Sequence, residues 1–297
     1  MSICPIQPFS PNIISDVQNM GCFEFMQHAI EAGTLTAIIA GITGYFVVLR
    51  RSAFTAHAFS EIGFAGAAGA VVLGIAPLAG LLAGSILGGV AIAILGRRVS
   101  NRDTQVGIVL AFSLGLGLLF INLYRGGYAT ATYSILFGEI IGVSSWEVNL
   151  TAVAGVCIVV AMGVLYRPLL FASLDEDVAE AKGMPMLFLG TAFMLVVAVT
   201  VSFAVQVTGV LLIFSLMVTP AAASQYLSKR PNRVIAISVV LALLATWIGL
   251  FVSFYTNYPV SFFITAFAFG AYLLVRLVHW VASPQKPATP APATSPR

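Results

Sequence analysis

Charged residues are scarce in this chain of 297 residues, because Asp, Glu, Lys and Arg together make up only 8% of it. Soluble globular domains carry about 25% charged residues, so the composition excludes an ordinary soluble protein. Hydrophobic residues make up 59% of the chain, and the mean hydropathy is +1.00. Apolar runs of about 20 residues recur, and each is long enough to cross about 30 Å of hydrocarbon as a helix. The sequence therefore predicts an all-α fold, a polytopic transmembrane helical bundle.

Several motif classes are also missing from the sequence. The three cysteines, Cys4, Cys22 and Cys157, form no CxxC pair, so neither a zinc cluster nor a redox motif is indicated. No GxxxxGK[ST] pattern occurs, which excludes a P-loop ATPase. No basic patch with interleaved aromatic residues indicates nucleic-acid binding. Residues 1–24 lack the Lys/Arg-rich start of a cleavable signal peptide.

Nine apolar segments are long enough to span a membrane by length and hydropathy. They cover residues 26–49, 54–74, 77–96, 106–124, 149–166, 187–205, 208–228, 234–255 and 260–281. The sixth and seventh segments are separated by hardly any loop, in the stretch QVTG. A version with eight spans and one broken or re-entrant segment is therefore also compatible with the sequence.

The basic residues predict the orientation of these spans. Cytoplasmic loops of membrane proteins are enriched in Lys and Arg, and alternate connections here carry Arg50, Arg51, Arg97, Arg98, Arg102, Arg167, Lys182, Lys229, Arg230, Arg233 and Arg276. Only Arg125 lies in the long segment 125–148. We therefore expect the N-terminus outside and the C-terminus inside, with an extracytoplasmic segment 1–25, a membrane domain 26–282 and a disordered cytoplasmic tail 283–297, which is rich in Pro, Ala and Thr.

A short acidic stretch interrupts the apolar pattern between the fifth and sixth spans. In RPLLFASLDEDVAEAKGMP, residues 167–185, four of the eleven acidic residues fall within six positions: Asp175, Glu176, Asp177 and Glu180. Acidic residues stabilise the first turn of a helix, whereas a cation and a left-handed glycine suit its end. We expect a cytoplasmic helix of about ten residues over about 171–183, with Pro168 near its start, Lys182 and Gly183 at its end, and one narrow apolar face of Leu174, Val178 and Ala181.

The segment FTAHAFSEIGF places two ionisable residues, His57 and Glu61, four positions apart inside an apolar span. They share one helix face, and both types are costly in lipid unless they face a cavity or a partner. Imidazole and carboxylate groups form a suitable first shell for Zn²⁺ or Mn²⁺. We expect this pair to handle a metal transiently on a translocation path. The alternative is a hydrogen bond between His57 and Glu61 that fixes the helix and binds nothing.

Glycines repeat at four-residue spacing in the third span, at Gly80, Gly84 and Gly88. Small residues on one helix face allow neighbouring helices to approach closely in a membrane. We expect these glycines to make packing contacts.

Five ordered stretches resemble one known family. LYRPLLFASLDEDVAEAKGMP closely resembles the cytoplasmic coupling helix of ABC-transporter permeases of the manganese/zinc/iron-chelate uptake family. Further similar stretches are FAGAAGAVVLG, which follows a segment similar to the family's Ser-His-Ala helix, RDTQVGIVLAFSLGLGLL, LFGEIIGVSSWEV and VTGVLLIFSLMVTPAAAS. The family usually has Asp at the position of His57 and His at the position of Glu61, so the present chain keeps the chemistry but changes the order.

The resemblance implies the membrane-spanning permease subunit of an ATP-driven importer of divalent metal ions, zinc or manganese, in a bacterial inner membrane. It implies a separate cytoplasmic ABC ATPase that binds ATP and Mg²⁺, an extracytoplasmic metal-binding protein, and no cofactor or enzymatic activity in the permease itself. The coupling helix would contact the ATPase through Leu174, Asp175, Glu176, Val178 and Gly183. Because an ATPase dimer offers two clefts, we expect the permease to form a homodimer.

Two other classes remain as alternatives. An ion-coupled secondary transporter of metals or small solutes would need coupling-ion acids near the midplane, and the spans are nearly free of acids beyond Glu61. An intramembrane metalloprotease would need an H-E-x-x-H motif, and HAFSE does not match it.

Overall fold

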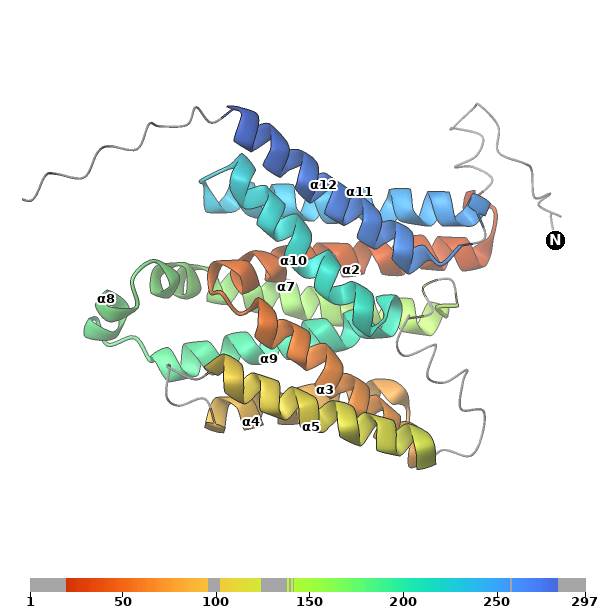
Figure 1. Cartoon of the computed structure of the whole chain (residues 1–297), viewed down its shortest axis with the longest axis horizontal. Helices are drawn as coiled ribbons and strands as arrows, with labels where there is room; N and C mark the ends of the chain where they lie inside the picture. Colours follow the sequence, from red (N-terminus) through yellow and green to blue (C-terminus); the bar gives the residue numbers. More distant parts are fainter. Residues whose placement is uncertain are drawn as a thin grey trace, which may run out of the picture.

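The computed structural model describes residues 20–95, 102–123, 138, 140, 142–256 and 258–282. The tail 283–297 and most of the segment 1–25 therefore lie outside the described residues. The described residues form ten helices and no strand (Figure 1). The helices are α2 (Glu24–Leu49), α3 (Ala53–Val72), α4 (Pro77–Leu95), α5 (Arg102–Leu123), α7 (Ser145–Leu174), α8 (Glu176–Ala181), α9 (Met186–Thr208), α10 (Val210–Leu227), α11 (Pro231–Thr256) and α12 (Val260–Ala282).

The all-α prediction is confirmed, and each of the nine predicted spans falls on one long helix. Among the described residues, six helical stretches are both long and apolar enough to cross a membrane: α2, Asp103–Leu123 of α5, α7, α9, α11 and α12. The other three long helices are α3, α4 and α10. His57 and Glu61 lower the hydropathy of α3, and the described parts of α4 and α10 include the apolar stretches Pro77–Ile92 and Leu212–Leu227.

The long helices alternate in direction along the bundle (Figure 1). The start of α2 lies at one end of the bundle, whereas α8 and the last turns of α12 lie at the opposite end. Helices α3, α10 and α12 cross the others obliquely. The two ends of the described chain are therefore at opposite ends of the bundle.

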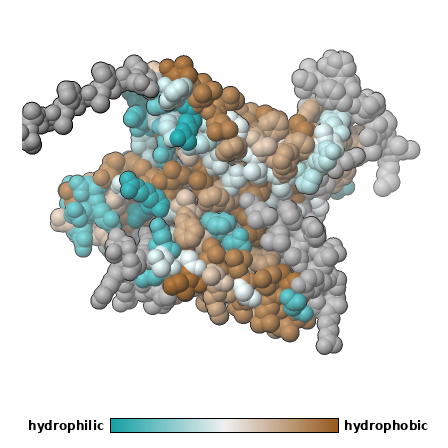
Figure 2. Space-filling model, in the orientation of Figure 1, coloured by the Kyte–Doolittle hydropathy of each residue, from teal (hydrophilic) through white to brown (hydrophobic). Residues whose placement is uncertain are grey.

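Hydrophobic and hydrophilic side chains are distributed over the surface as in a membrane protein. In Figure 2 the middle of the visible face is mostly hydrophobic, and hydrophilic surface gathers around α8 at one end. The most apolar 18-residue windows of α5 and α12 are only 22% and 17% buried, against 67% for α2. Helix α2 is therefore central, while α5 and α12 present apolar side chains outward.

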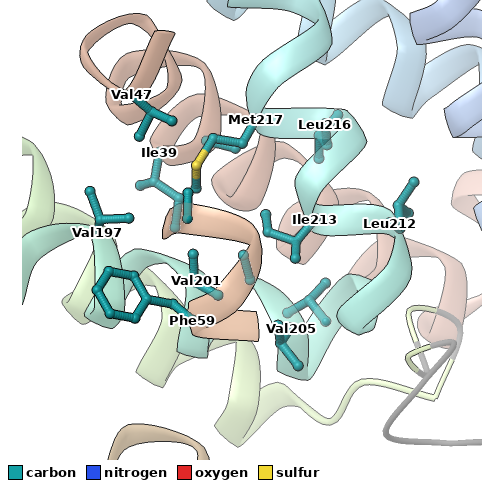
Figure 3. Packing of buried hydrophobic residues seen from close by; sticks show 14 of the residues in the cluster. Ile39, Val47, Phe59, Val197, Val201, Val205, Leu212, Ile213, Leu216 and Met217 are labelled. Carbon is teal, nitrogen blue, oxygen red and sulfur yellow. The ribbon is translucent and has the colours of Figure 1, made fainter. Parts of the chain in front are cut away.

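The core lies where α2, α3, α9 and α10 meet (Figure 3). Ile39, Phe59 and Met217 come from three of these helices and are essentially inaccessible to solvent. Helix α9 contributes a row at i, i+4 and i+8 on one face: Val197, Val201 and Val205. Since lipid tails are as apolar as these side chains, such packing stabilises the bundle mainly through van der Waals contact.

Glycines bring α3 and α4 into direct backbone contact. A Cβ atom on Gly80 would lie 2.2 Å from the carbonyl oxygen of Gly66, and one on Gly84 would lie 2.9 Å from that of Ile62. A Cβ atom on Gly88 would meet the side chain of Ile62 at 2.6 Å. The predicted packing role of Gly80, Gly84 and Gly88 is thus confirmed. The Ser85 hydroxyl adds a hydrogen bond to the Phe59 carbonyl, at 3.1 Å.

A single residue, Gly209, joins α9 to α10. It has a φ of +84°, in a region where glycine alone is unstrained, and α10 runs back along the bundle from this point (Figure 1). Gly138 packs on the junction, because a Cβ atom there would lie 2.4 Å from the Gly209 nitrogen. Residues 186–227 therefore form two separate antiparallel helices, with a reversal too tight for the sequence to reveal as a loop.

Candidate functional site

The acidic stretch after the fifth span has different helix bounds from those predicted. Helix α7 continues through Pro168 to Leu174, because Leu169 and Ala172 in its last turns are buried against the bundle. The separate helix α8 covers only six residues, Glu176–Ala181, instead of about 171–183. The break is at Asp175, whose backbone is extended with φ −153° and ψ 102°.

Both ends of α8 are capped by hydrogen bonds. The Asp175 carboxylate accepts a hydrogen bond from the Val178 N–H at 3.0 Å, as an N-cap does. Gly183 has the predicted left-handed conformation, with φ +77°. Its N–H donates to the Glu180 carbonyl and the Met184 N–H donates to the Ala179 carbonyl, which is the Schellman arrangement. A helix of six residues is thus held in one conformation.

Helix α8 presents an acidic and apolar surface away from the bundle. Asp175, Glu176, Asp177 and Glu180 are exposed, and so are Leu174 (74%) and Val178 (42%). Ala179 is the residue that faces inward, with no exposed surface. The ammonium group of Lys182 lies 5.1 Å from the centre of the Phe171 ring and ties the end of α8 to α7. The arrangement offers charge for orientation and two apolar side chains for contact.

His57 and Glu61 lie in the first turns of α3, on the side where α3 passes α10. Glu61 is only 8% exposed, and His57 is half-buried. The imidazole ring of His57 lies 5.0 Å from the ring of Phe214 on α10, centre to centre. Figure 2 shows a small hydrophilic area within the mostly hydrophobic face near this crossing.

Within the described part of the chain, no hydrogen bond or ion pair joins His57 to Glu61. Nδ1 of His57 is buried and has no partner among the described residues. The Ser60 hydroxyl donates to the main-chain carbonyl of His57 at 2.7 Å and leaves the imidazole unoccupied. A buried imidazole nitrogen without a partner among the described residues and a nearly buried carboxylate on the same helix are groups that a cation can engage.

The described residues of a single copy supply too few ligands for a stable metal site. Among the described residues, no group of three or more His, Cys, Asp or Glu side chains could hold a metal ion. His57 and Glu61 together give one nitrogen and one carboxylate, while tetrahedral zinc sites use four ligands. The pair suits brief contact with a passing ion, or half of a site that another chain completes.

Sequence reasoning missed two features of this region. Phe214 contacts His57 through the packing of α3 on α10, and nothing local in either segment signals that contact. The other feature, at α8, is Asp175 as an N-cap, and its residue type followed by the acidic Glu176 and Asp177 could have indicated it.

The arrangement as a whole defines a polytopic membrane transport protein. A mostly apolar helical bundle carries a sparse pair of ionisable groups inside and a capped acidic helix at one end. The chain belongs to the ABC 3 transport family, which it matches over residues 22–279. The family resemblance drawn from the sequence is thereby confirmed. The chain is a permease component and not an enzyme, and an ABC permease implies an ATPase and a substrate-binding partner.

Several proteins are similar to this one over most of its length. It is 28% identical over 242 residues to the manganese import system permease protein ScaB of Streptococcus gordonii, covering 81% of this chain and 86% of that protein. It is 26% identical over 256 residues to the high-affinity zinc uptake system membrane protein ZnuB of Buchnera aphidicola, covering 86% and 98%. A solved structure, PsaBC from Streptococcus pneumoniae in complex with Fab, is similar with a TM-score of 0.80 at 27% identity, covering 89% of this chain and 95% of that one.

Proposed function

We propose that the chain is the membrane-spanning permease subunit of an ATP-driven importer of divalent metal ions, with zinc or manganese as the transported ion. The observation that carries the proposal is the match to an ABC transport family over nearly the whole membrane domain. The names of the two relatives, one a manganese and one a zinc permease, agree with it. The imidazole and carboxylate of His57 and Glu61 suit both ions.

In this proposal all nine long helices cross the membrane, with the N-terminus outside and α8 in the cytoplasm. The described connections at the α8 end carry Arg50, Arg51, Lys182, Lys229 and Arg230, whereas those at the opposite end, residues 73–76, 142–144 and 258–259, have no Lys or Arg. Cys22, just before α2, is disulfide-bonded. Disulfides persist in oxidising compartments outside the cytoplasm, which supports the same orientation.

Helix α8 is the proposed contact with the ATPase. Leu174 and Val178 provide apolar contact, Asp175 and Glu176 provide charge, and Gly183 fixes the chain direction at the helix end. ATP and Mg²⁺ would bind to the ATPase, so the permease needs no cofactor of its own. Because α8 follows α7 after one extended residue, a push on α8 would be transmitted to the long helix α7.

The metal path is proposed to run past His57 and Glu61 between two copies of the chain. Two copies related by a two-fold axis would supply two imidazoles and two carboxylates, a set that suits Zn²⁺ and is acceptable for Mn²⁺. Transport also requires that the ion leave again, so binding there is transient. The ion is delivered to the outer side by an extracytoplasmic metal-binding protein.

The test is metal uptake into proteoliposomes that contain the permease, its ATPase and its binding protein. The proposal predicts accumulation of radioactive Mn²⁺ or Zn²⁺ that requires ATP on the ATPase side. Uptake that proceeds without ATP but follows an imposed ion gradient would indicate a secondary transporter and contradict the proposal.

A further inference from the structure

A cavity of about 350 Å³ opens at the end of the bundle opposite α8. Its walls come from the start of α4, the start of α7 and the end of α9. The described residues that line it are Ala76, Pro77, Leu78, Leu81, Gly142, Val143, Trp146, Glu147, Leu150, Val205 and Gln206. Cavities of this size accommodate small ligands. Most of the lining is apolar, so the few polar groups in it decide which occupant the cavity favours.

Glu147 and Gln206 are the exceptions in this lining. The amide nitrogen of Gln206 donates to Oε1 of Glu147 at 2.9 Å. This contact fixes the amide orientation, because the opposite orientation would place the amide oxygen against the carboxylate. Oε1 of Gln206 is then buried without a hydrogen-bond partner in the described part of the chain. A buried acceptor of this kind lacks a donor that an occupant could supply.

The carboxylate of Glu147 is held in place by the start of α7. Its Oε2 accepts hydrogen bonds from the N–H and the hydroxyl of Ser144, both at 2.9 Å, in a capping box. Oε1 receives only the Gln206 amide. None of the described lining residues is Lys, Arg or His. The described lining thus offers two oxygen acceptors and one negative charge, and none of its described residues is a cation that balances this charge.

The cavity lies beside an apolar stripe on α7. Trp146, which lines the cavity, is 72% exposed and begins the stripe. Val153, Val156, Val160 and Val164 continue it along the same helix face, each at least 60% exposed. Tryptophan is enriched where a membrane meets water. An acyl chain can lie along the valines while its polar head reaches the cavity.

We propose that this cavity binds the headgroup of a phospholipid that carries a primary ammonium group, on the outer side of the membrane. The ammonium has three N–H donors. It would donate to both Oε1 of Glu147 and Oε1 of Gln206, because these two side chains are hydrogen-bonded to each other. A divalent metal ion fits less well, since two oxygen groups in an apolar wall cannot replace its hydration shell. The inference rests on the proposed orientation but not on metal transport.

The test measures lipid retention by the purified full chain with native mass spectrometry. Phosphatidylethanolamine, phosphatidylcholine and phosphatidylglycerol are added in equal amounts. Of the three headgroups, only phosphatidylethanolamine has N–H donors on its nitrogen. We expect it to be retained about tenfold more than the other two, as hydrogen bonds to charged groups are the stronger class. Equal retention of the three lipids overturns the proposal.

Two variants locate the binding. Gln206→Leu removes the free acceptor, and Glu147→Gln removes the charge while Gln still serves at this position of a capping box. Each should lower retention of phosphatidylethanolamine to that of phosphatidylcholine. Gln225→Leu is the matched control, because Gln225 is a half-buried glutamine with an unpartnered amide at the other end of the bundle. Unchanged retention in both cavity variants, or displacement of the lipid by Mn²⁺ alone, contradicts the assignment.

Discussion

The imidazole of His57 lies against the ring of Phe214, with centres 5.0 Å apart and planes tilted by 59°. The contact links α3 to α10 at the point where His57 keeps a buried nitrogen without a partner among the described residues. Phe214 is 36% exposed, so its ring forms part of the surface beside His57. It holds the imidazole in place without using either nitrogen.

Replacement of Phe214 by Ala should therefore lower metal uptake by several fold while the complex still assembles. The imidazole would lose an aromatic contact worth about 1 kcal/mol and would sample other orientations. The measurement is the initial rate of Mn²⁺ and Zn²⁺ uptake in the reconstituted transporter. Phe262→Ala is the control, because Phe262 on α12 is 64% exposed and its ring pairs with that of Phe263. Equal uptake rates for the two variants would show that Phe214 has no role in the translocation path.

Charge reversal on α8, with Asp175→Lys and Glu176→Lys, should abolish stimulation of the ATPase by metal while leaving membrane insertion intact. Charge orients the docking surface, and reversal would repel a complementary partner. The assay is ATP hydrolysis by the assembled complex with and without metal and binding protein.

Asp175→Lys also removes an N-cap, which costs about 1 kcal/mol. The matched variant Asp175→Asn with Glu176→Gln keeps a capping side chain and removes only charge. A partial loss of stimulation in this variant would assign the effect to charge. Full stimulation in both variants would mean that the ATPase contacts another part of the permease.

Gly80→Ala should destabilise the bundle by about 1–3 kcal/mol, because overpacking forces backbones apart. The new methyl group would lie 2.2 Å from the Gly66 carbonyl oxygen, and α3 and α4 would have to separate. Gly107→Ala on α5 is the control, since nothing lies within 4 Å of a Cβ atom there. Thermal unfolding in detergent should show a lower midpoint for Gly80→Ala alone. Equal midpoints would show that α3 and α4 accommodate the added methyl group without loss of stability.

Two copies of the chain should be present in the active transporter. One copy offers one α8 and no group of three metal-ligating side chains among its described residues. Native mass spectrometry or crosslinking of the reconstituted complex counts the copies. An active complex with one copy of this chain would rule out the shared metal site.

The positions of the long helices could be predicted from the sequence, because a membrane helix needs an uninterrupted apolar run and satisfies its own backbone hydrogen bonds. The end of α7 could not be placed in this way. The sequence predicts Pro168 near a helix start, but a proline inside α7 is tolerated where Leu169 and Ala172 are buried against the bundle. Local sequence gives no information on that tertiary packing.

The candidate site was predictable in part for similar reasons. His57 and Glu61 stand out because ionisable residues are rare in apolar spans. Glu147 carries a local signal as well, since Ser144 and Glu147 match a capping box. Gln206 meets Glu147, and Phe214 meets His57, only because separate helices pack together. Spacing along the chain contains no trace of these contacts.

The most direct test of the account is ATP-driven uptake of radioactive Mn²⁺ and Zn²⁺ by the variant with His57→Gln and Glu61→Gln. Glutamine keeps the size and polarity of both side chains but removes the imidazole and the charge. The account predicts that uptake of both ions falls by roughly tenfold or more, with the dimer and the bound ATPase unchanged. In the single variants, loss of the carboxylate should affect Mn²⁺ more and loss of the imidazole should affect Zn²⁺ more. Full uptake in the double variant would contradict the central claim that the metal passes His57 and Glu61.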